Sequence, residues 1–368
     1  MRNREIDFLR GLAILLVLFR HHTVFLFIYQ GGGVGVDLFF VLSGFLIGGL
    51  LFEEYKRHGN LEIGRFLIRR GFKIYPSYYA ALSVTIIWLI IASYRGYKAF
   101  PLAKTIYNLV FLQNYFDGII GPTWSLAVEE HFYFLLPVLL LWFIAKNTLK
   151  RGNAFPRFFI AVGIVCLAGR ILTAKYIGVS LLNLCFPTHL RIDSLLFGVL
   201  ISYYYHFKDE QLTRFYNKYR LILLISSTAL IIPFFMNFDA ELPFRDRYII
   251  FTIGFTALYY AFGVWLVAMV KDPAVSGTLK KVLTKPVYNF VAFTGFYSYN
   301  IYLWHNWAGF IADIDHYPNI ALFHEYPKIL ALIYFVMSYA LGIGITHALE
   351  IPFLKIRDKY FPRRARPV

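Results

Sequence analysis

Apolar stretches of about twenty residues recur along this 368-residue chain, and they constrain its fold more than any other feature. One of them, residues 34–52, reads VGVDLFFVLSGFLIGGLLF and contains a single charged side chain. In hydrocarbon every backbone polar group needs a partner within the protein, so only helices and closed β-barrels can span a bilayer. The runs do not alternate between apolar and polar residues, as the strands of a barrel would. The sequence therefore predicts an all-α, polytopic membrane protein.

We predict about ten transmembrane helices around a polar central site. The composition agrees, because 58% of the residues are hydrophobic and only 16% are charged, against about 25% charged in soluble domains. The expected spans are residues 8–28, 34–52, 72–94, 124–145, 157–173, 190–206, 219–236, 249–270, 289–311 and 328–350. They form one transmembrane domain, residues 1–350, followed by a basic cytoplasmic tail, residues 351–368.

The net charge of +16 is explained by topology rather than by a nucleic-acid partner. If the N-terminus is cytoplasmic, most of the 37 Lys and Arg residues fall in cytoplasmic segments, which is the positive-inside pattern. Both termini are therefore expected on the cytoplasmic side of a bacterial inner or plasma membrane. The two cysteines, Cys166 and Cys185, lack metal-binding spacing, and no metal site or bound cofactor is expected.

The first apolar run holds four basic side chains, Arg10, Arg20, His21 and His22. An ionisable side chain at the bilayer centre costs a few kcal/mol, so each one is a functional hypothesis. Arg10 and His21 are eleven residues apart, which leaves them within about 20° of one helix face and roughly 16 Å apart along the axis. Arg10 alone is equally explained as a side chain that reaches from a helix end to the interface.

The other polar groups of the spans fall into two levels. On the inner side, where the third span begins, lie Arg65, Arg69, Arg70 and Lys73. On the outer side lie Asp37, Glu129, Glu130, His131, Arg191, Asp193 and His305. His21, Glu129 and His305 are expected at one depth, roughly 9–10 Å below the outer boundary. A lone intramembrane histidine is more often structural, but three such groups at one depth favour a site for proton transfer.

The inner cationic cluster suits a phosphate, although an ordinary positive-inside loop explains most of it equally well. Together the two levels favour a phosphorylated cytoplasmic ligand held below an acid/base centre. An acyl-coenzyme A thioester fits this description, because its phosphates would stay at the cytoplasmic face while its arm carries the acyl group inward. A lipid phosphate fits the same geometry.

Five stretches together resemble the membrane-bound acyltransferase 3 family, which includes bacterial O-acetyltransferases of surface polysaccharides. In order along the chain they are REIDFLRGLAILLVLFRHH, GGGVGVDLFFVLSGFLI, TWSLAVEEHFYFLLP, RIDSLLFG and YSYNIYLWH. The first keeps the family's spacing of Arg, ten residues and His as Arg10 and His21. The third aligns Glu129 with the characteristic acid of the family. The first two motifs are specific, whereas YLWH alone would be weak.

The resemblance implies a ten-span core, and the esterase-like domain that some larger members carry is not expected in this sequence. It also implies acyl transfer, most often of acetyl, from acyl-CoA to a hydroxyl of a sugar, glycan or lipid-linked saccharide. In this reading Arg10, Arg69, Arg70 and Lys73 contact the donor, and His21 is the central catalytic group. One departure is Lys73, which stands where the family usually has Arg and lacks its planar, bidentate donor group.

The preferred mechanism uses His21 as a general base on the acceptor hydroxyl; an acyl-histidine relay is the alternative. Glu129 or Asp37 would orient its imidazole, and His305 would be a second acid/base or an acceptor-binding group. The remaining supporting candidates are Arg191, Asp193, Ser43, Ser298 and Tyr302, and ordinary helix packing more often explains residues such as the last three.

Two other functions compete with acyl transfer. A proton-coupled transporter would also use intramembrane His, Glu and Arg residues, but the chain has no matching pair of interrupted spans in its two halves. A lipid-linked glycosyltransferase would resemble others of its kind in carrying acidic residues in the first external loop, where this chain has QGGG. The expected partners are thus acyl-CoA, a carbohydrate acceptor and membrane lipid.

Overall fold

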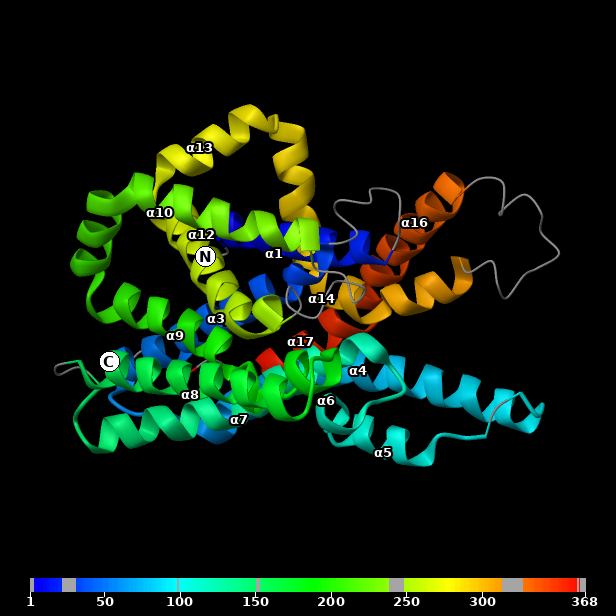
Figure 1. Cartoon of the computed structure of the whole chain (residues 1–368). Coiled ribbons are helices and arrows are strands. Elements are labelled where there is room, and N and C mark those ends of the chain that lie inside the picture. The colour runs from blue at the N-terminus through cyan, green and yellow to red at the C-terminus, as the bar shows by residue number, and fades with distance from the viewer. Residues whose placement is uncertain are drawn as a thin grey trace.

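The structure, a computed structural model, describes residues 3–21, 31–97, 99–149, 153–237, 248–312, 327–362 and 364. Every regular element in these ranges is a helix, which confirms the all-α prediction (Figure 1). Among the described residues, seven helical segments are long and apolar enough to cross a membrane. They are Gly32–His58, Ile63–Tyr94, Gly121–Ala145, Ala154–Tyr176, Asp209–Phe235, Ile250–Lys271 and Lys328–Tyr360.

The number of spans, about ten, stays a prediction. The other three expected spans fall on helices α1 (Arg4–Arg20), α9 (Ile192–Phe207) and α14 (Lys285–Ala312). Helices α1 and α9 have 17 and 16 described residues, so each is about 24–26 Å long and shorter than the hydrocarbon core. Helix α14 has 28 residues, which is long enough, but it carries polar side chains such as Asn300 and His305.

Each of the remaining long helices covers most of an expected span, although α4 and α10 begin nine and ten residues before theirs. They are α3 (Gly35–His58), α4 (Ile63–Tyr94), α7 (Trp124–Ala145), α8 (Ala154–Tyr176), α10 (Asp209–Asn237), α12 (Phe255–Lys271) and α16 (Pro327–Ile345). Shorter helices are α5 (Leu102–Leu109), α6 (Gln113–Phe116), α13 (Pro273–Val282) and α17 (Ile351–Tyr360). A π-helical turn, η7 (Thr346–Glu350), joins α16 to α17, so the helix continues into the basic C-terminal segment.

Two closely packed helix pairs form the centre of the bundle. Near the middle of the molecule α1, in blue, lies against α14, in orange-yellow, and α3 lies against α9 (Figure 1). A methyl group added at Gly11 or Gly295 would lie 1.8 Å from a backbone oxygen of the facing helix, and one at Gly44 or Gly198 would lie 1.9 or 2.1 Å away. Only hydrogen fits at these four positions, so reciprocal glycines hold each pair together.

The loop between α4 and α7 contains a short amphipathic helix, α5. Helix α5 exposes Leu102, Ile106 and Leu109, while Thr105 and Asn108 are buried. This polarity is the reverse of that of a soluble surface helix. It favours a position at the membrane interface, where the exposed apolar side contacts lipid.

Replacing a packed glycine should destabilise the bundle. We expect Gly295→Ala to lower the free energy of unfolding by about 1–3 kcal/mol, because its methyl group meets a backbone oxygen that cannot move aside easily. Gly277→Ala in α13 is the matched control, since nothing lies within 4 Å of its added Cβ. It should leave stability unchanged or raise it by up to about 1 kcal/mol. Thermal unfolding in detergent measures both, and equal midpoints would contradict the close packing.

Candidate active site

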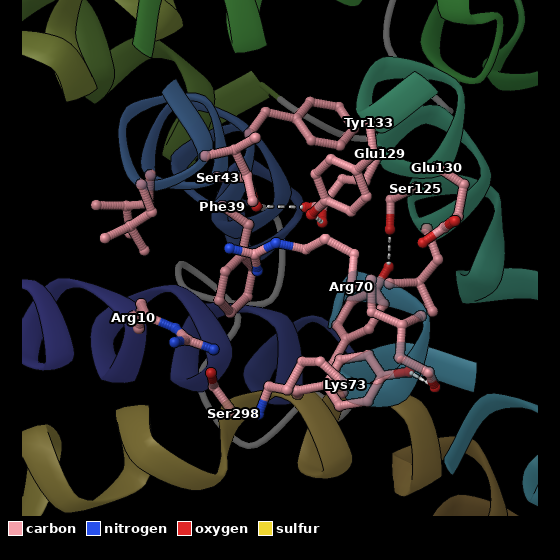
Figure 2. A pocket seen from close by; sticks show the side chains of 18 of the residues that line it. Arg10, Phe39, Ser43, Arg70, Lys73, Ser125, Glu129, Glu130, Tyr133 and Ser298 are labelled. Carbon is pink, nitrogen blue, oxygen red and sulfur yellow. Dashed lines mark hydrogen bonds between the residues drawn. The ribbon is translucent and has the colours of Figure 1, made fainter. Parts of the chain in front are cut away.

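A polar pocket of about 130 Å³ lies among helices α1, α3, α4, α7 and α14 (Figure 2). Eight residues that the sequence singles out meet in its wall, although they come from five different helices. They are Arg10, Ser43, Arg70, Lys73, Glu129, Glu130, Ser298 and Tyr302. We call this cavity the inner pocket, and its residues are separated in the sequence by up to 292 positions.

Glu129 is held in the inner pocket by two hydroxyl groups. Ser43 Oγ donates a hydrogen bond to its Oε1 over 3.0 Å, and the Tyr133 hydroxyl donates to its Oε2 (Figure 2). Tyr133 is one helical turn after Glu129 on the same face of α7, a spacing that sequence reasoning did not use. Both carboxylate oxygens thus have partners on the pocket wall.

The three cations of the inner pocket differ in how they are compensated. Lys73 forms an ion pair with Glu350, which also accepts a hydrogen bond from Asn300 over 2.7 Å. Arg10 and Arg70 extend into the pocket (Figure 2), and neither forms an ion pair or a hydrogen bond with any residue that the structure describes. Their guanidinium groups are therefore available to a ligand, whereas the charge of Lys73 is already neutralised.

A second cavity of about 320 Å³, which we call the basic cavity, adjoins the inner pocket. Arg70 and Lys73 line both cavities. The basic cavity also contains Arg57, Arg65, Arg69, Arg357 and Arg364. Two of these, Arg65 and Arg69, belong to the inner cluster that the sequence indicates. The other three come from the end of α3 and from the C-terminal segment, where basic residues are too common to mark a site from sequence alone.

The C-terminal segment lies across the basic cavity. Arg69 donates hydrogen bonds to the Phe361 carbonyl and to Asp358, the latter over 3.0 Å. Arg364 pairs with Glu62 at 3.1 Å and so ties the segment to the start of α4. The basic tail predicted from the sequence therefore completes the wall of a cavity built by the transmembrane helices.

His21, which directly follows α1, contacts His305 within α14, although the two residues are far apart in the sequence. Their ring centroids are 4.9 Å apart with an angle of 51° between the planes. His305 is buried, with 1% of its surface exposed, whereas His21 is exposed. The neighbouring His22 lies outside the described residues.

The expected grouping of His21, Glu129 and His305 is only partly found. The two histidines come together, but Glu129 lies instead with Arg10 and Arg70 in the inner pocket, whose lining among the described residues includes neither histidine. The reason is that depth along a helix does not determine the direction in which a side chain points.

Tyr302 lies between the inner pocket and the histidine pair. Its hydroxyl donates a hydrogen bond to the Pro122 carbonyl over 2.6 Å and shares another with Ser125 Oγ over 2.6 Å. Its ring centroid is 5.6 Å from that of His305. Tyr302 thus forms part of the pocket wall on one side and contacts the histidine pair on the other.

Asp37, Arg191 and Asp193 form buried ion pairs outside the inner pocket. Asp37 pairs with Arg191, and Asp193 pairs with Arg170 of α8 at 2.9 Å. Arg191 also lies over the ring of Phe255, 3.5 Å from its centroid. The sequence suggests Asp37 as a partner of His21, but this pairing favours a structural role that ties α3 to α9. Arg191 and Asp193 likewise support the bundle.

Comparison with known proteins shows the family of the chain. Residues 3–350 match the acyltransferase 3 family model, described as an acyltransferase domain. The chain belongs to the acyltransferase 3 family. The resemblance recognised in the motifs is thereby confirmed, and the chain is a multi-pass membrane protein of this family. No solved structure matches it.

Three curated relatives illustrate what this family member is similar to. It is 31% identical to the peptidoglycan O-acetyltransferase of Listeria monocytogenes serovar 1/2a, over 82% of this chain and 48% of that protein. It is 29% identical to a protein of Staphylococcus aureus (strain COL) provisionally named O-acetyltransferase, over 82% and 49%. A Bacillus subtilis protein provisionally named peptidoglycan O-acetyltransferase is 28% identical, over 82% and 47%. The chain spans about half the length of these relatives.

Breaking the Asp37–Arg191 pair should cost more than removing it entirely. We expect Arg191→Met to lower the free energy of unfolding by about 3–5 kcal/mol, because Asp37 would remain as an unpaired buried charge. The double variant Asp37→Leu/Arg191→Met should recover a large part of that loss. Thermal unfolding of the three proteins in detergent tests this, and a double variant that is less stable than the single one would contradict it.

Proposed function

We propose that this protein is an O-acyltransferase that moves an acyl group, most often acetyl, from cytoplasmic acyl-CoA to a hydroxyl of a carbohydrate. The acceptor would be a sugar, a glycan or a lipid-linked saccharide at or near the outer face. The observation that carries this proposal is the basic cavity joined through Arg70 and Lys73 to a deeper polar pocket. The names of the relatives support the transfer of acetyl to oxygen.

The donor would bind with its phosphates in the basic cavity. Guanidinium groups bind phosphate oxygens through paired, charge-assisted hydrogen bonds, and five of them line this cavity besides Arg70. Each of the five is paired with a carboxylate, which a bound phosphate would replace or share. The arm of the donor would pass Arg70 and Lys73 into the inner pocket, with Arg10 beside it. The ion pair of Lys73 with Glu350 suggests that this lysine shapes the passage more than it binds phosphate.

The basic cavity would face the cytoplasm under the positive-inside rule, together with both termini. In this arrangement residues 351–368 act as part of the donor site rather than as an independent tail, since Arg357 and Arg364 line the cavity. The domain of residues 1–350 would then need this segment for full affinity toward the donor.

The chemistry would take place where the inner pocket approaches the histidine pair. His21 would take the proton of the acceptor hydroxyl while the hydroxyl oxygen bonds to the carbonyl carbon of the thioester. The C–S bond then breaks, the ester is released, and the CoA thiolate takes the proton from the imidazolium. Because His21 is exposed and lies beyond Tyr302, the acceptor would approach from the side opposite to the donor.

General-base catalysis contributes about 10²–10⁴-fold, so His21→Ala should lower acetyl-CoA turnover by that factor. The measurement is release of free CoA from acetyl-CoA by the purified protein in proteoliposomes, with carbohydrate acceptors present. The control is His206→Ala, because His206 bonds to Ser202 of its own helix and lines neither cavity. This control should retain full turnover.

The same assay can reject the proposal. Turnover by His21→Ala equal to that of the wild type would remove His21 from the chemistry. If the wild type releases no CoA with any acyl donor or acceptor, and a pH gradient drives flux of a solute across the membrane, the protein is a proton-coupled transporter instead.

A further inference from the structure

The general base of the proposed reaction needs a partner that orients its imidazole, and the obvious carboxylates are engaged elsewhere. Both oxygens of Glu129 accept hydrogen bonds from Ser43 and Tyr133. Asp37 is paired with Arg191. Neither acidic side chain is free to hold His21, so the partner must come from another group next to its ring.

His305 is in contact with His21, and its backbone surroundings decide which of its nitrogens carries the proton. Nδ1 of His305 forms a hydrogen bond with the carbonyl oxygen of Tyr302, one turn earlier in α14. A carbonyl oxygen only accepts, so Nδ1 must donate and the proton of the neutral ring resides there. Burial at 1% exposure favours the neutral form of the imidazole.

This tautomer leaves Nε2 of His305 as a lone-pair acceptor. Nε2 is buried and has no hydrogen-bond partner among the residues that the structure describes. A buried polar atom without a partner costs about 1–3 kcal/mol, so a donor is expected to occupy it during function. The histidine ring in contact with His305 is that of His21, at a centroid separation of 4.9 Å.

We propose that His305 is the positioning residue of the proposed reaction: its Nε2 accepts the N–H of His21 and thereby leaves the other nitrogen of His21 as the base. This inference rests on the proposed function. It places a neutral imidazole beside the general base, where many catalytic histidines have a carboxylate. The proton of the acceptor hydroxyl goes to the other nitrogen of His21 and later to the departing thiolate. His305 itself neither gains nor loses a proton.

Two substitutions at position 305 separate this role from acid/base catalysis. Glutamine keeps an acceptor oxygen near the position of Nε2 but transfers no proton near neutral pH, whereas phenylalanine keeps the ring shape without any acceptor. We expect His305→Phe to lower kcat for CoA release by about 10²–10³-fold. His305→Gln should retain at least about a tenth of wild-type kcat, and KM for acetyl-CoA should change little in both variants.

The control pair is His347→Phe and His347→Gln. His347 is another histidine of the bundle that bonds to a tyrosine hydroxyl, Tyr297, over 3.2 Å and lines neither cavity. Both of these variants should keep wild-type kcat. Thermal midpoints measured for all four variants identify any that fails to fold. If His305→Phe is the one that fails, His305→Asn replaces it as a variant that lacks an acceptor at the Nε2 position.

The effect of His305 should act only through His21. In a His21→Ala background, His305→Phe should therefore cause no further loss, because groups that work as a unit are not additive. Equal inactivation by Gln and Phe would overturn the proposal in favour of proton transfer by His305 itself. Full activity of His305→Phe would also overturn it. A wild type that turns over no acyl-CoA would overturn the proposed function and this inference together.

Discussion

The requirement that charges within a membrane be compensated governs this structure. Asp37, Arg170, Arg191 and Asp193 are almost completely buried, and they form two ion pairs that link α3, α8 and α9. An unpaired charge in this environment would cost several kcal/mol, so these contacts restrict how the three helices can be arranged. Helix α3, held in this way, places Ser43 in the wall of the inner pocket, where it bonds to Glu129 of α7.

The same requirement distinguishes the groups of the site from those of the scaffold. Lys73 is neutralised by Glu350, and Glu129 is held by two hydroxyl donors. Arg10 and Arg70 have no hydrogen-bond or ion-pair partner among the described residues, and Nε2 of His305 has no hydrogen-bond partner among them. Because most other charges of the described residues are paired, Arg10 and Arg70 mark the path from the basic cavity into the inner pocket, and His305 contacts His21 beyond it.

Much of this path was predictable from residue types and spacing. The all-α class and a polar central site follow from polar groups that have few other reasons to lie in apolar spans. The sequence placed Arg10 and Arg70 near the inner side and Glu129 at the outer level, and it did not predict that they line one pocket. The position of Glu129 relative to the histidines did not follow, because counting residues from a helix end measures depth and not direction. The contribution of Arg357 and Arg364 was also hidden, since a basic tail is common in membrane proteins.

The sequence by itself determined that this chain is a helical membrane protein and which of its residues are too polar to be there without a reason. Every segment in the hydrocarbon must satisfy the requirements of the membrane by itself, so helical spans and unusual polar residues can be recognised from short stretches of sequence. Only the tertiary structure decided which of those residues are partners. Asp37 could serve His21 or Arg191 as far as the sequence is concerned, and the packing of α3 against α9 settles the matter in favour of Arg191. Partner choice depends on helix rotation and close backbone approach, which are properties of pairs of helices and not of any one segment.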